Sequence, residues 1–262
     1  MVGIGIDIGS TAAKAAVVEA DDAIAWTCVM PTGYSSVDAA ERLRAELASA
    51  GYDVAADDVR VVATGYGRVA VPYAHKVVTE ITCHGTGAVA LFGDHGTVID
   101  VGGQDTKVIQ LKGGRVAKFA MNDKCAAGTG RFYEAMARSF EMTLPEFSNL
   151  SLGAKNVIPI TAQCTVFAES EVITLVGEGK PMDEIAAGIQ MAVAKRCFVM
   201  AKKAGATDSI TLTGGCAKNA GLKQAIEHVL KLKVIDLKTD PQLMGALGAA
   251  EYARQKGLSK GV

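Results

Sequence analysis

Pairs of short apolar runs separated by a polar turn occur at two places in the chain, and this pattern is typical of antiparallel β-strands. At the first place the turn contains Asp21 and Asp22, and at the second it contains Gly113 and Gly114. Aspartate and glycine are residues that tight turns favour. The pattern therefore predicts four strands, at residues 15–19, 23–30, 108–111 and 116–121.

Residues 36–50 carry apolar side chains at helical spacing, which predicts an amphipathic helix. Ser35, followed three positions later by Asp38, predicts a capping box at its start, and Gly51 predicts its end. The side chains that we expect on its buried face are Val37, Ala40, Leu43 and Leu47.

The same order of elements continues after both places. Strands are expected at 59–63 and 210–212, and both end in the dipeptide Thr-Gly. Each is followed by an expected short strand and then by a helix rich in small residues. The short strands are predicted at 76–81 and 233–237, and the helices at 85–92 and 243–253.

The strings that precede the strand pairs form an internal repeat. Residues 6–14 read Ile-Asp-Ile-Gly-Ser-Thr-Ala-Ala-Lys, and residues 99–107 read Ile-Asp-Val-Gly-Gly-Gln-Asp-Thr-Lys. At a constant spacing, Asp7 matches Asp100, Gly9 matches Gly102 and Lys14 matches Lys107. The repeat predicts an α/β protein of two β-β-β-α-β-α halves, at residues 1–94 and 95–262. The hinge is expected near residues 93–96, and the second half carries an insertion at about 122–205.

Composition and charge exclude several classes of protein. Lys plus Arg number 27 and Asp plus Glu number 28, a balance that argues against a general nucleic-acid binder. With 49% hydrophobic and 21% charged residues, the chain is typical of a globular protein. The longest uncharged stretch, 23–37, is shorter than the ~18 residues that a membrane span needs. Because the chain also lacks a basic segment before an apolar one at its N-terminus, we expect a soluble cytoplasmic protein.

The cysteines show no local metal-binding pattern. There are six, at positions 28, 83, 125, 164, 197 and 216, and no Cys-x-x-Cys occurs. In a reducing cytoplasm we expect them to be free thiols. Neither a zinc site nor a single-chain iron–sulfur site of the common local type is predicted.

The repeated string itself suits phosphate and metal chemistry. An aspartate at the end of a strand holds Mg²⁺ through water, and the glycines and small hydroxyl residues after it expose backbone N–H groups to anionic oxygens. One such string fits many buried strands, whereas two in register are much stronger evidence. The alternative at this point is that Asp7 and Asp100 only cap turns.

A second kind of glycine turn follows the strand at 210–212. Residues 213–219 read Thr-Gly-Gly-Cys-Ala-Lys-Asn, which predicts a strand, a glycine turn and a helix. That geometry brings backbone close to a flat ring or a phosphate, although a plain tight turn fits as well. Residues 64–68, Thr-Gly-Tyr-Gly-Arg, form a similar and weaker pattern.

Together these motifs resemble the actin–hexokinase–heat-shock ATPase superfamily, in which two ribonuclease-H-like halves enclose a nucleotide cleft. Two cysteine strings narrow the resemblance: residues 122–132, Asn-Asp-Lys-Cys-Ala-Ala-Gly-Thr-Gly-Arg-Phe, and residues 164–171, Cys-Thr-Val-Phe-Ala-Glu-Ser-Glu. They are similar to those of the activators, or component A, of 2-hydroxyacyl-CoA dehydratases. The ATPase subunits of benzoyl-CoA reductase stand close by in the same family of CoA-substrate-specific enzyme activases. The resemblance covers essentially the whole chain.

For Cys125 and Cys164 the resemblance implies iron ligation. Each precedes an expected helix, one beginning near Thr129 and one at 166–176, and a helix N-terminus favours a thiolate. Two ligands cannot hold a four-cysteine cluster, but a two-fold homodimer offers four. The family places one [4Fe–4S] cluster there, between the subunits. The alternative is that both are small buried apolar residues, which is the interpretation we give to the other four cysteines.

The resemblance also implies an activity. The protein is expected to be an ATP-hydrolysing one-electron reductase of anaerobic metabolism that takes electrons from a ferredoxin or flavodoxin and passes them to a separate dehydratase. Asp7 and Asp100 would organise Mg²⁺, and Gln104 would orient the attacking water. Closure and opening of the nucleotide cleft would rotate the helices that meet the cluster. The expected phosphate-binding residues are Gly9, Ser10, Thr11, Lys14, Gly102, Gly103 and Lys107, and the expected adenosine-binding residues are Gly214, Gly215 and Asn219.

Some assignments remain open. The positive residues Lys124, Arg131 and Arg138 form either a solvated face or a docking patch for acidic electron carriers. Glu169 and Glu171 are interpreted as helix-start carboxylates rather than ligands or bases. Alternative functions are an ATPase subunit of benzoyl-CoA reductase or of a related iron–sulfur reductase, an amino-sugar kinase of the same superfold, and a non-redox interaction protein.

Overall fold

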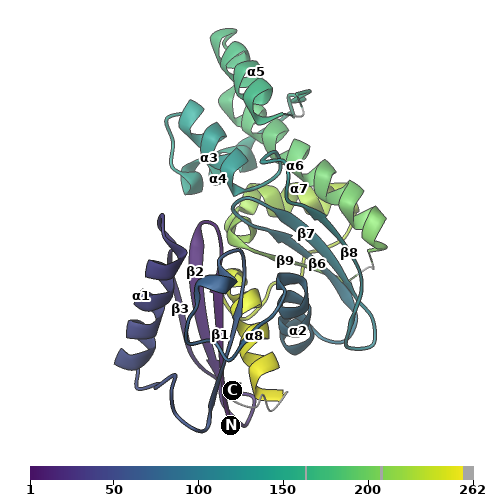
Figure 1. Ribbon diagram of the computed structural model, residues 1–262. Coiled ribbons are helices and arrows are strands. Elements are labelled where there is room, and N and C mark those ends of the chain that lie inside the picture. Colours follow the sequence, from purple (N-terminus) through teal and green to yellow (C-terminus); the bar gives the residue numbers. More distant parts are fainter. Residues whose placement is uncertain (163, 207–208, 256–262) are drawn as a thin grey trace. The chain divides into compact units, whose positions relative to one another are not determined.

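The computed structural model describes residues 1–162, 164–206 and 209–255, which form two β-sheets with helices packed on them (Figure 1). The strands are β1 Val2–Ile8, β2 Ala12–Val18, β3 Ile24–Pro31, β4 Val59–Thr64, β5 Lys76–Val77, β6 Gly96–Val101, β7 Thr106–Leu111, β8 Val116–Asn122 and β9 Ile210–Thr213. The α-helices are α1 Ser36–Ser49, α2 Glu80–Phe92, α3 Gly130–Ser139, α4 Leu144–Leu150, α5 Thr165–Gly177, α6 Met182–Ala204, α7 Ala220–Leu230 and α8 Met244–Gln255. Four short 3₁₀ turns lie at Arg68–Ala70, Ser151–Gly153, Gly215–Lys218 and Pro241–Leu243.

The first compact unit contains the sheet with strand order β3-β2-β1-β4-β5. Its first three strands are antiparallel neighbours, whereas β4 runs parallel to β1. Along β1 isoleucines alternate with glycines, so the two kinds of residue point to opposite faces of the sheet. Ile4, Ile6 and Ile8 join Leu43 and Leu47 of α1 in one core. On the other face, the absence of side chains at the glycines lets α8 pack directly on the strand.

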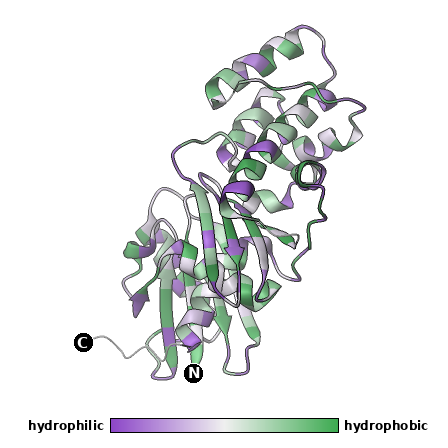
Figure 2. Ribbon diagram, turned by 90° about the vertical axis from the view of Figure 1, so that its right-hand side faces the viewer, coloured by the Kyte–Doolittle hydropathy of each residue, from purple (hydrophilic) through white to green (hydrophobic). Residues whose placement is uncertain are grey.

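The second compact unit contains the sheet with order β8-β7-β6-β9, in which β6 and β9 are parallel. Helices α3 to α7 belong to this unit, and the largest apolar core of the described residues lies among them and the sheet. Apolar residues predominate along the strands, as the colouring of Figure 2 shows. Phe132 and Met136 of α3 are buried in this core together with Phe140, the C-cap residue of the helix.

The units differ from the division expected from the repeat. Residues 111–116 and 237–255 belong by their contacts to the first unit, although the repeat places both segments in the second half. The physical reason is visible in α8, whose backbone lies against β1 and α2. A Cβ at Gly5 would overlap the carbonyl oxygen of Ala246, and a Cβ at Gly248 would overlap that of Cys83.

Most predicted elements are present. The four strands of the two pairs form, and α1 begins after Ser35, whose hydroxyl accepts the Asp38 N–H at 3.2 Å. Gly51 follows the helix with φ +91°, a conformation that glycine adopts readily. The expectation for Val37 is wrong: its side chain is 56% exposed because the buried face of α1 is turned toward Ala39 and Ala40 instead.

Two short segments also differ from expectation. The strand expected at 76–81 stops at Val77, since Thr79 already precedes the first turn of α2. The segment 233–237 forms no strand within the described ranges, and Val234 makes only an isolated bridge to Ile210. The insertion at 122–205 contains α3, α4, α5 and α6. Among the helices described here, none is long and apolar enough to cross a bilayer.

The close packing of α8 on β1 makes a stability prediction. Gly5→Ala should destabilise the protein by at least about 1–3 kcal/mol, because the new methyl group must displace helix backbone rather than a flexible side chain. The measurement is the urea midpoint of unfolding. Gly153→Ala is the matched control, since a Cβ there has no neighbour within 4 Å. Equal midpoints for the two variants would contradict this packing.

Candidate nucleotide and cysteine sites

Asp7 and Asp100 occupy equivalent positions in the two units. Asp7 is paired with Thr64 across the parallel strands β1 and β4, and Asp100 is paired with Thr213 across β6 and β9. Both carboxylates are buried, at 2% and 3% exposure. The Thr213 hydroxyl donates to Asp100 Oδ1 at 2.7 Å. Each unit thus presents one buried carboxylate where two parallel strands end.

A glycine follows each of the two threonines, and its backbone lies directly against the buried aspartate of the same unit. Gly65 and Gly214 have φ values of +87° and +82°. A Cβ at Gly65 would overlap Asp7 Oδ1, and a Cβ at Gly214 would lie 3.1 Å from Asp100 Oδ1. Both positions therefore need glycine for conformation and for space. The pattern at 64–68, weaker in sequence, forms the same kind of turn as 213–215.

Lysines neutralise the buried carboxylates. Lys14 Nζ lies 3.0 Å from Asp7 Oδ2. Lys107, whose side chain is 1% exposed, lies 3.3 Å from Asp100 Oδ2 and 2.7 Å from Asp105 Oδ2. Because burying an unpaired charge is costly, these contacts offset the burial of the carboxylates and fix the two side chains in place. The binding of phosphate by the two lysines stays a prediction.

The loop after each aspartate closes in the same way. Gly9 N–H donates to Ala12 O at 3.1 Å, and Gly102 N–H donates to Asp105 O at 2.9 Å. Within the described residues, the backbone N–H groups of Ser10 and Thr11 in the first loop have no hydrogen-bond partner, and neither have those of Gly103 and Gln104 in the second. Such turns with unpaired N–H groups suit anionic oxygens. Gln104 is exposed, and its contact with an attacking water stays a prediction.

Asp7 also meets a condition for a cation site. Its Oδ1 is buried and has no hydrogen-bond partner in the described part of the chain, so an ion or a metal-bound water fits there. His84 lies beside this carboxylate, although sequence reasoning missed it. A Cβ built on Gly245 would be 2.6 Å from Asp7 Oδ2 and 3.0 Å from His84 Cε1. His84 has no metal-ligand spacing in the sequence, so no pattern marks it.

The expected adenosine loop forms a glycine turn that leads into α7. Gly215 is exposed, and residues Gly215–Lys218 make a 3₁₀ turn. Asn219 is the N-cap of α7, and its Oδ1 accepts from Leu222 N–H at 2.9 Å. The same oxygen accepts from Ser148 Oγ at 2.9 Å and from Gln190 Nε2 at 3.1 Å. The oxygen of Asn219 therefore fixes three helices together, and contact of this residue with a nucleotide stays a prediction.

Cys125 and Cys164 are both exposed. Cys164 is the N-cap residue of α5, and Cys125 lies shortly before α3. The alternative of two buried apolar residues does not describe these thiols. By contrast, Cys83, Cys197 and Cys216 are buried, and burial raises the pKa of each to about 12. Those three thiols are neutral at physiological pH and are poor iron ligands.

Glu171 fixes the chain that precedes Cys164. Its carboxylate accepts from Thr161 N–H at 2.9 Å, Ala162 N–H at 2.8 Å and the Thr161 hydroxyl at 2.9 Å. Burial acts to raise the pKa of Glu171, but these donors outweigh it and hold the pKa below its ordinary value. Glu169 accepts from Ser139 Oγ at 3.3 Å and so connects α5 with α3. The interpretation of Glu169 and Glu171 as helix-start carboxylates is wrong, because both lie beyond the first turn of α5. Glu171 instead binds backbone outside the helix.

The described residues of one chain do not complete a metal site. No group of three or more cysteine, histidine or carboxylate side chains is close enough to hold a metal ion there. One chain supplies two exposed thiols, those of Cys125 and Cys164. The four ligands of a [4Fe–4S] cluster would therefore require a second copy of the chain. Iron ligation by Cys125 and Cys164 stays a prediction.

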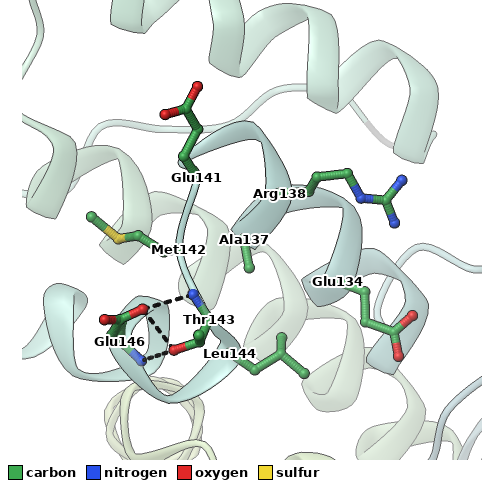
Figure 3. A pocket seen from close by; sticks show the side chains of 8 residues that line it. All are labelled: Glu134, Ala137, Arg138, Glu141, Met142, Thr143, Leu144 and Glu146. Atoms are coloured by element: carbon green, nitrogen blue, oxygen red, sulfur yellow. Dashed lines mark hydrogen bonds between the residues drawn. The ribbon is translucent and has the colours of Figure 1, made fainter.

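The positive residues near α3 lie among acids. Arg131 pairs with Glu134 at 2.7 Å. Arg138 lies with Glu134 and Glu141 along an open groove of about 530 Å³ between α3 and α4 (Figure 3). Glu146 on the same groove forms a capping box with Thr143, which fixes the start of α4. This surface has mixed charge, and none of the expected nucleotide or iron residues lines the groove.

The two sheets, with a buried aspartate at matching strand ends, define a protein of the actin–hexokinase–heat-shock ATPase superfold, as expected from the repeat. The chain belongs to the BadF/BadG/BcrA/BcrD ATPase family, whose sequence model matches residues 4–253.

Relatives with assigned roles support this membership. The activator of lactoyl-CoA dehydratase from Anaerotignum propionicum is 42% identical over 263 residues, covering 99% of this chain and 100% of the relative. The crystal structure of component A of (R)-2-hydroxyglutaryl-CoA dehydratase from Acidaminococcus fermentans has a TM-score of 0.92 at 37% identity, covering 99% and 100% of the two chains. The activator of 2-hydroxyisocaproyl-CoA dehydratase from Clostridium difficile, solved with bound ADPNP, has a TM-score of 0.89 at 38% identity, covering 98% and 95%.

Proposed function

We propose that this protein is an ATP-hydrolysing activator of a 2-hydroxyacyl-CoA dehydratase and that it delivers single electrons from a [4Fe–4S] cluster shared by two copies of the chain. The observation that carries the proposal is the pair of exposed thiols, Cys164 at the N-cap of α5 and Cys125 in the segment that leads into α3. The roles of the named relatives support the same activity.

The nucleotide part of the proposal rests on the two aspartate loops. Asp7 and Asp100 would hold Mg²⁺ through water, and the buried Asp7 Oδ1, which has no partner among the described residues, supports this role for Asp7. Unpaired N–H groups at residues 10–11 and 103–104 bind phosphate oxygens, and Gln104 orients the attacking water. Gly214 and Gly215 approach the adenosine. The bound ADPNP of the relative from Clostridium difficile supports ATP as the nucleotide.

The iron part of the proposal requires a second copy of the chain. An isologous interface repeats each residue, so two chains supply the four thiolates of Cys125 and Cys164. Helix α5, which starts at Cys164, exposes Val166, Phe167 and Ile173 at 58–70%. An apolar face of this kind beside the thiol suits burial against the partner copy. A four-iron cluster bound there supplies one-electron transfer.

The partners follow from the direction of electron flow. A ferredoxin or flavodoxin donates one electron, ATP is hydrolysed, and the electron passes to a separate dehydratase. Dehydration of the 2-hydroxyacyl thioester then takes place on that partner. Free thiols are stable in a reducing cytoplasm, where we place the reaction.

Iron analysis tests the proposal. Anaerobically purified protein should be brown and contain about four iron atoms for every two chains, and the colour should bleach in air. Four iron atoms per single chain would exclude the shared cluster. Iron-free protein that phosphorylates an amino sugar would instead identify a kinase. An iron-containing ATPase that reduces benzoyl-CoA reductase and no dehydratase would identify the other activase branch.

A further inference from the structure

The second phosphate loop is bonded directly to the segment that leads from Cys125 into α3. Gly130 N–H donates to Gly102 O at 2.8 Å, and Arg131 N–H donates to Gly103 O at 2.9 Å. The buried Thr106 hydroxyl donates to Gly128 O at 2.7 Å. The first two N–H groups of α3 are thus satisfied by the loop rather than by solvent.

Peptide geometry gives these bonds a direction. In a planar trans peptide the carbonyl oxygen and the following N–H point to opposite sides. Because the oxygens of Gly102 and Gly103 point toward α3, the N–H groups of Gly103 and Gln104 point away from it. These N–H groups have no partner within the described residues, and they are the ones proposed to bind phosphate. The same two peptide units therefore contact α3 on one side and face a phosphate on the other.

The first loop provides an internal comparison. There Gly9 O accepts from the Thr32 hydroxyl at 2.8 Å, and no α-helix N-terminus among the described residues bonds to Gly9 O or Ser10 O. Ala13 occupies the position that matches Thr106, so the bonding hydroxyl is absent. The two loops are otherwise closed by matching backbone bonds. The duplicated loops thus differ at the point where the second one contacts the segment that contains Cys125.

That segment has few internal degrees of freedom. Asn122 Nδ2 donates to Cys125 O at 2.9 Å, and the Thr129 hydroxyl donates to Ala126 O at 2.6 Å. Gly130 packs closely on the loop, since a Cβ there would lie 3.1 Å from Gly103 Cα. A displacement of the loop therefore moves the whole segment rather than being absorbed by it.

We propose that Thr106 is a positioning residue that couples the phosphate loop to the thiol of Cys125. The inference rests on the proposed function and adds the route by which nucleotide binding reaches the cysteine. Phosphate binding at Gly103 and Gln104 displaces the peptide units whose oxygens accept from the first N–H groups of α3. The hydrogen bond from Thr106 makes Gly128 move with them. Of the three hydrogen bonds, that of Thr106 is the one whose donor is a side chain, so it can be removed by substitution.

Iron release from the anaerobic holoprotein tests the coupling. The rate of iron transfer to a ferrous chelator is measured with MgADP and with Mg-ADPNP, and the ratio of the two rates reports the nucleotide-dependent change at the thiols. Thr106→Val should reduce this ratio at least about fivefold, the factor that one hydrogen bond contributes to an equilibrium. Thr106→Ser, which keeps the hydroxyl, should restore it. Nucleotide affinity and iron content should change less than about twofold. A general loss of structure would instead change both quantities.

Thr211→Val is the matched control. Thr211 is buried in the same unit, and its hydroxyl donates to Ile235 O at 2.7 Å, away from the cysteine segment. Its rate ratio should equal that of the parent protein. If Thr106→Val loses iron, Thr106→Ala, which copies Ala13 of the first loop, is measured instead. An unchanged ratio in the iron-containing variant, or a parent ratio of one, would overturn the coupling and leave the proposed function standing. Parent protein without iron would overturn the proposed function itself.

Discussion

Substitution of Cys164 by alanine is expected to abolish iron binding, and so is substitution of Cys125. Two-fold symmetry turns each change into the loss of two of the four proposed ligands. The two thiolates that remain do not hold a four-iron cluster, so the brown colour should be lost. The dimer should also weaken because its covalent bridge through iron disappears. Nucleotide binding should persist, since Asp7 and Asp100 lie in strands β1 and β6, which contain neither cysteine.

Cys197→Ala is the control for this experiment. Cys197 is a buried thiol of α6, and its loss should cost about 1 kcal/mol of packing while iron is retained. Cys28→Ala should behave in the same way. Iron content and ADPNP affinity are measured for all four variants. Loss of iron in Cys28→Ala together with full iron in Cys164→Ala would refute the ligand assignment.

Asp100→Ala should lower the rate of ATP hydrolysis at least about a hundredfold and leave the iron content unchanged. The carboxylate is proposed to position Mg²⁺, whose contribution to phosphoryl transfer is of this order or larger. Lys107 keeps Asp105 as a partner at 2.7 Å, so the change leaves no buried lysine without a carboxylate. The measurement is steady-state phosphate release beside iron analysis.

Two further variants separate chemistry from folding. Asp100→Asn keeps the volume and an oxygen that accepts from Thr213, and it should fold like the parent while hydrolysing ATP as slowly as Asp100→Ala. Asp236→Ala removes a carboxylate that is 77% exposed and paired with Lys223, and it should hydrolyse ATP normally. A rate within threefold of the parent in both Asp100 variants would remove Asp100 from the reaction.

Local patterns in the sequence account for the elements that local forces determine. The strand pairs, α1 and α3 follow from turn residues, caps and apolar spacing, which act over a few positions. The internal repeat identifies Asp7 and Asp100 as equivalent before any contact is known. The place of α8 was missed because helical spacing shows that one face is buried but not which sheet buries it. The sequence signal for this packing is the pair of glycines at positions 3 and 5. A strand that alternates isoleucine with glycine has one face without side chains, on which another backbone can pack closely.

The residues of the candidate site also divide into those that local sequence patterns identify and those that only tertiary packing brings together. The cysteine strings are local and are visible in the sequence. His84 and Asp7, by contrast, come near each other at Gly245 only through the packing of α2 and β1 against the first residues of α8. Glu171 was assigned by its nearness to a helix start, but its partners Thr161 and Ala162 lie outside that helix. The bond from Thr106 to Gly128 likewise joins residues that no spacing rule connects.

The packing of α8 on β1 has a consequence for the order of events during synthesis. Strand β1, Val2–Ile8, is synthesised well before the helix that covers its glycine face, Met244–Gln255. The second unit lies almost wholly between these two segments, so its sheet and helices are available to the nascent chain earlier. The unit with the first strand is therefore the last to complete its core, and until then one face of β1 is an open surface that a chaperone can recognise.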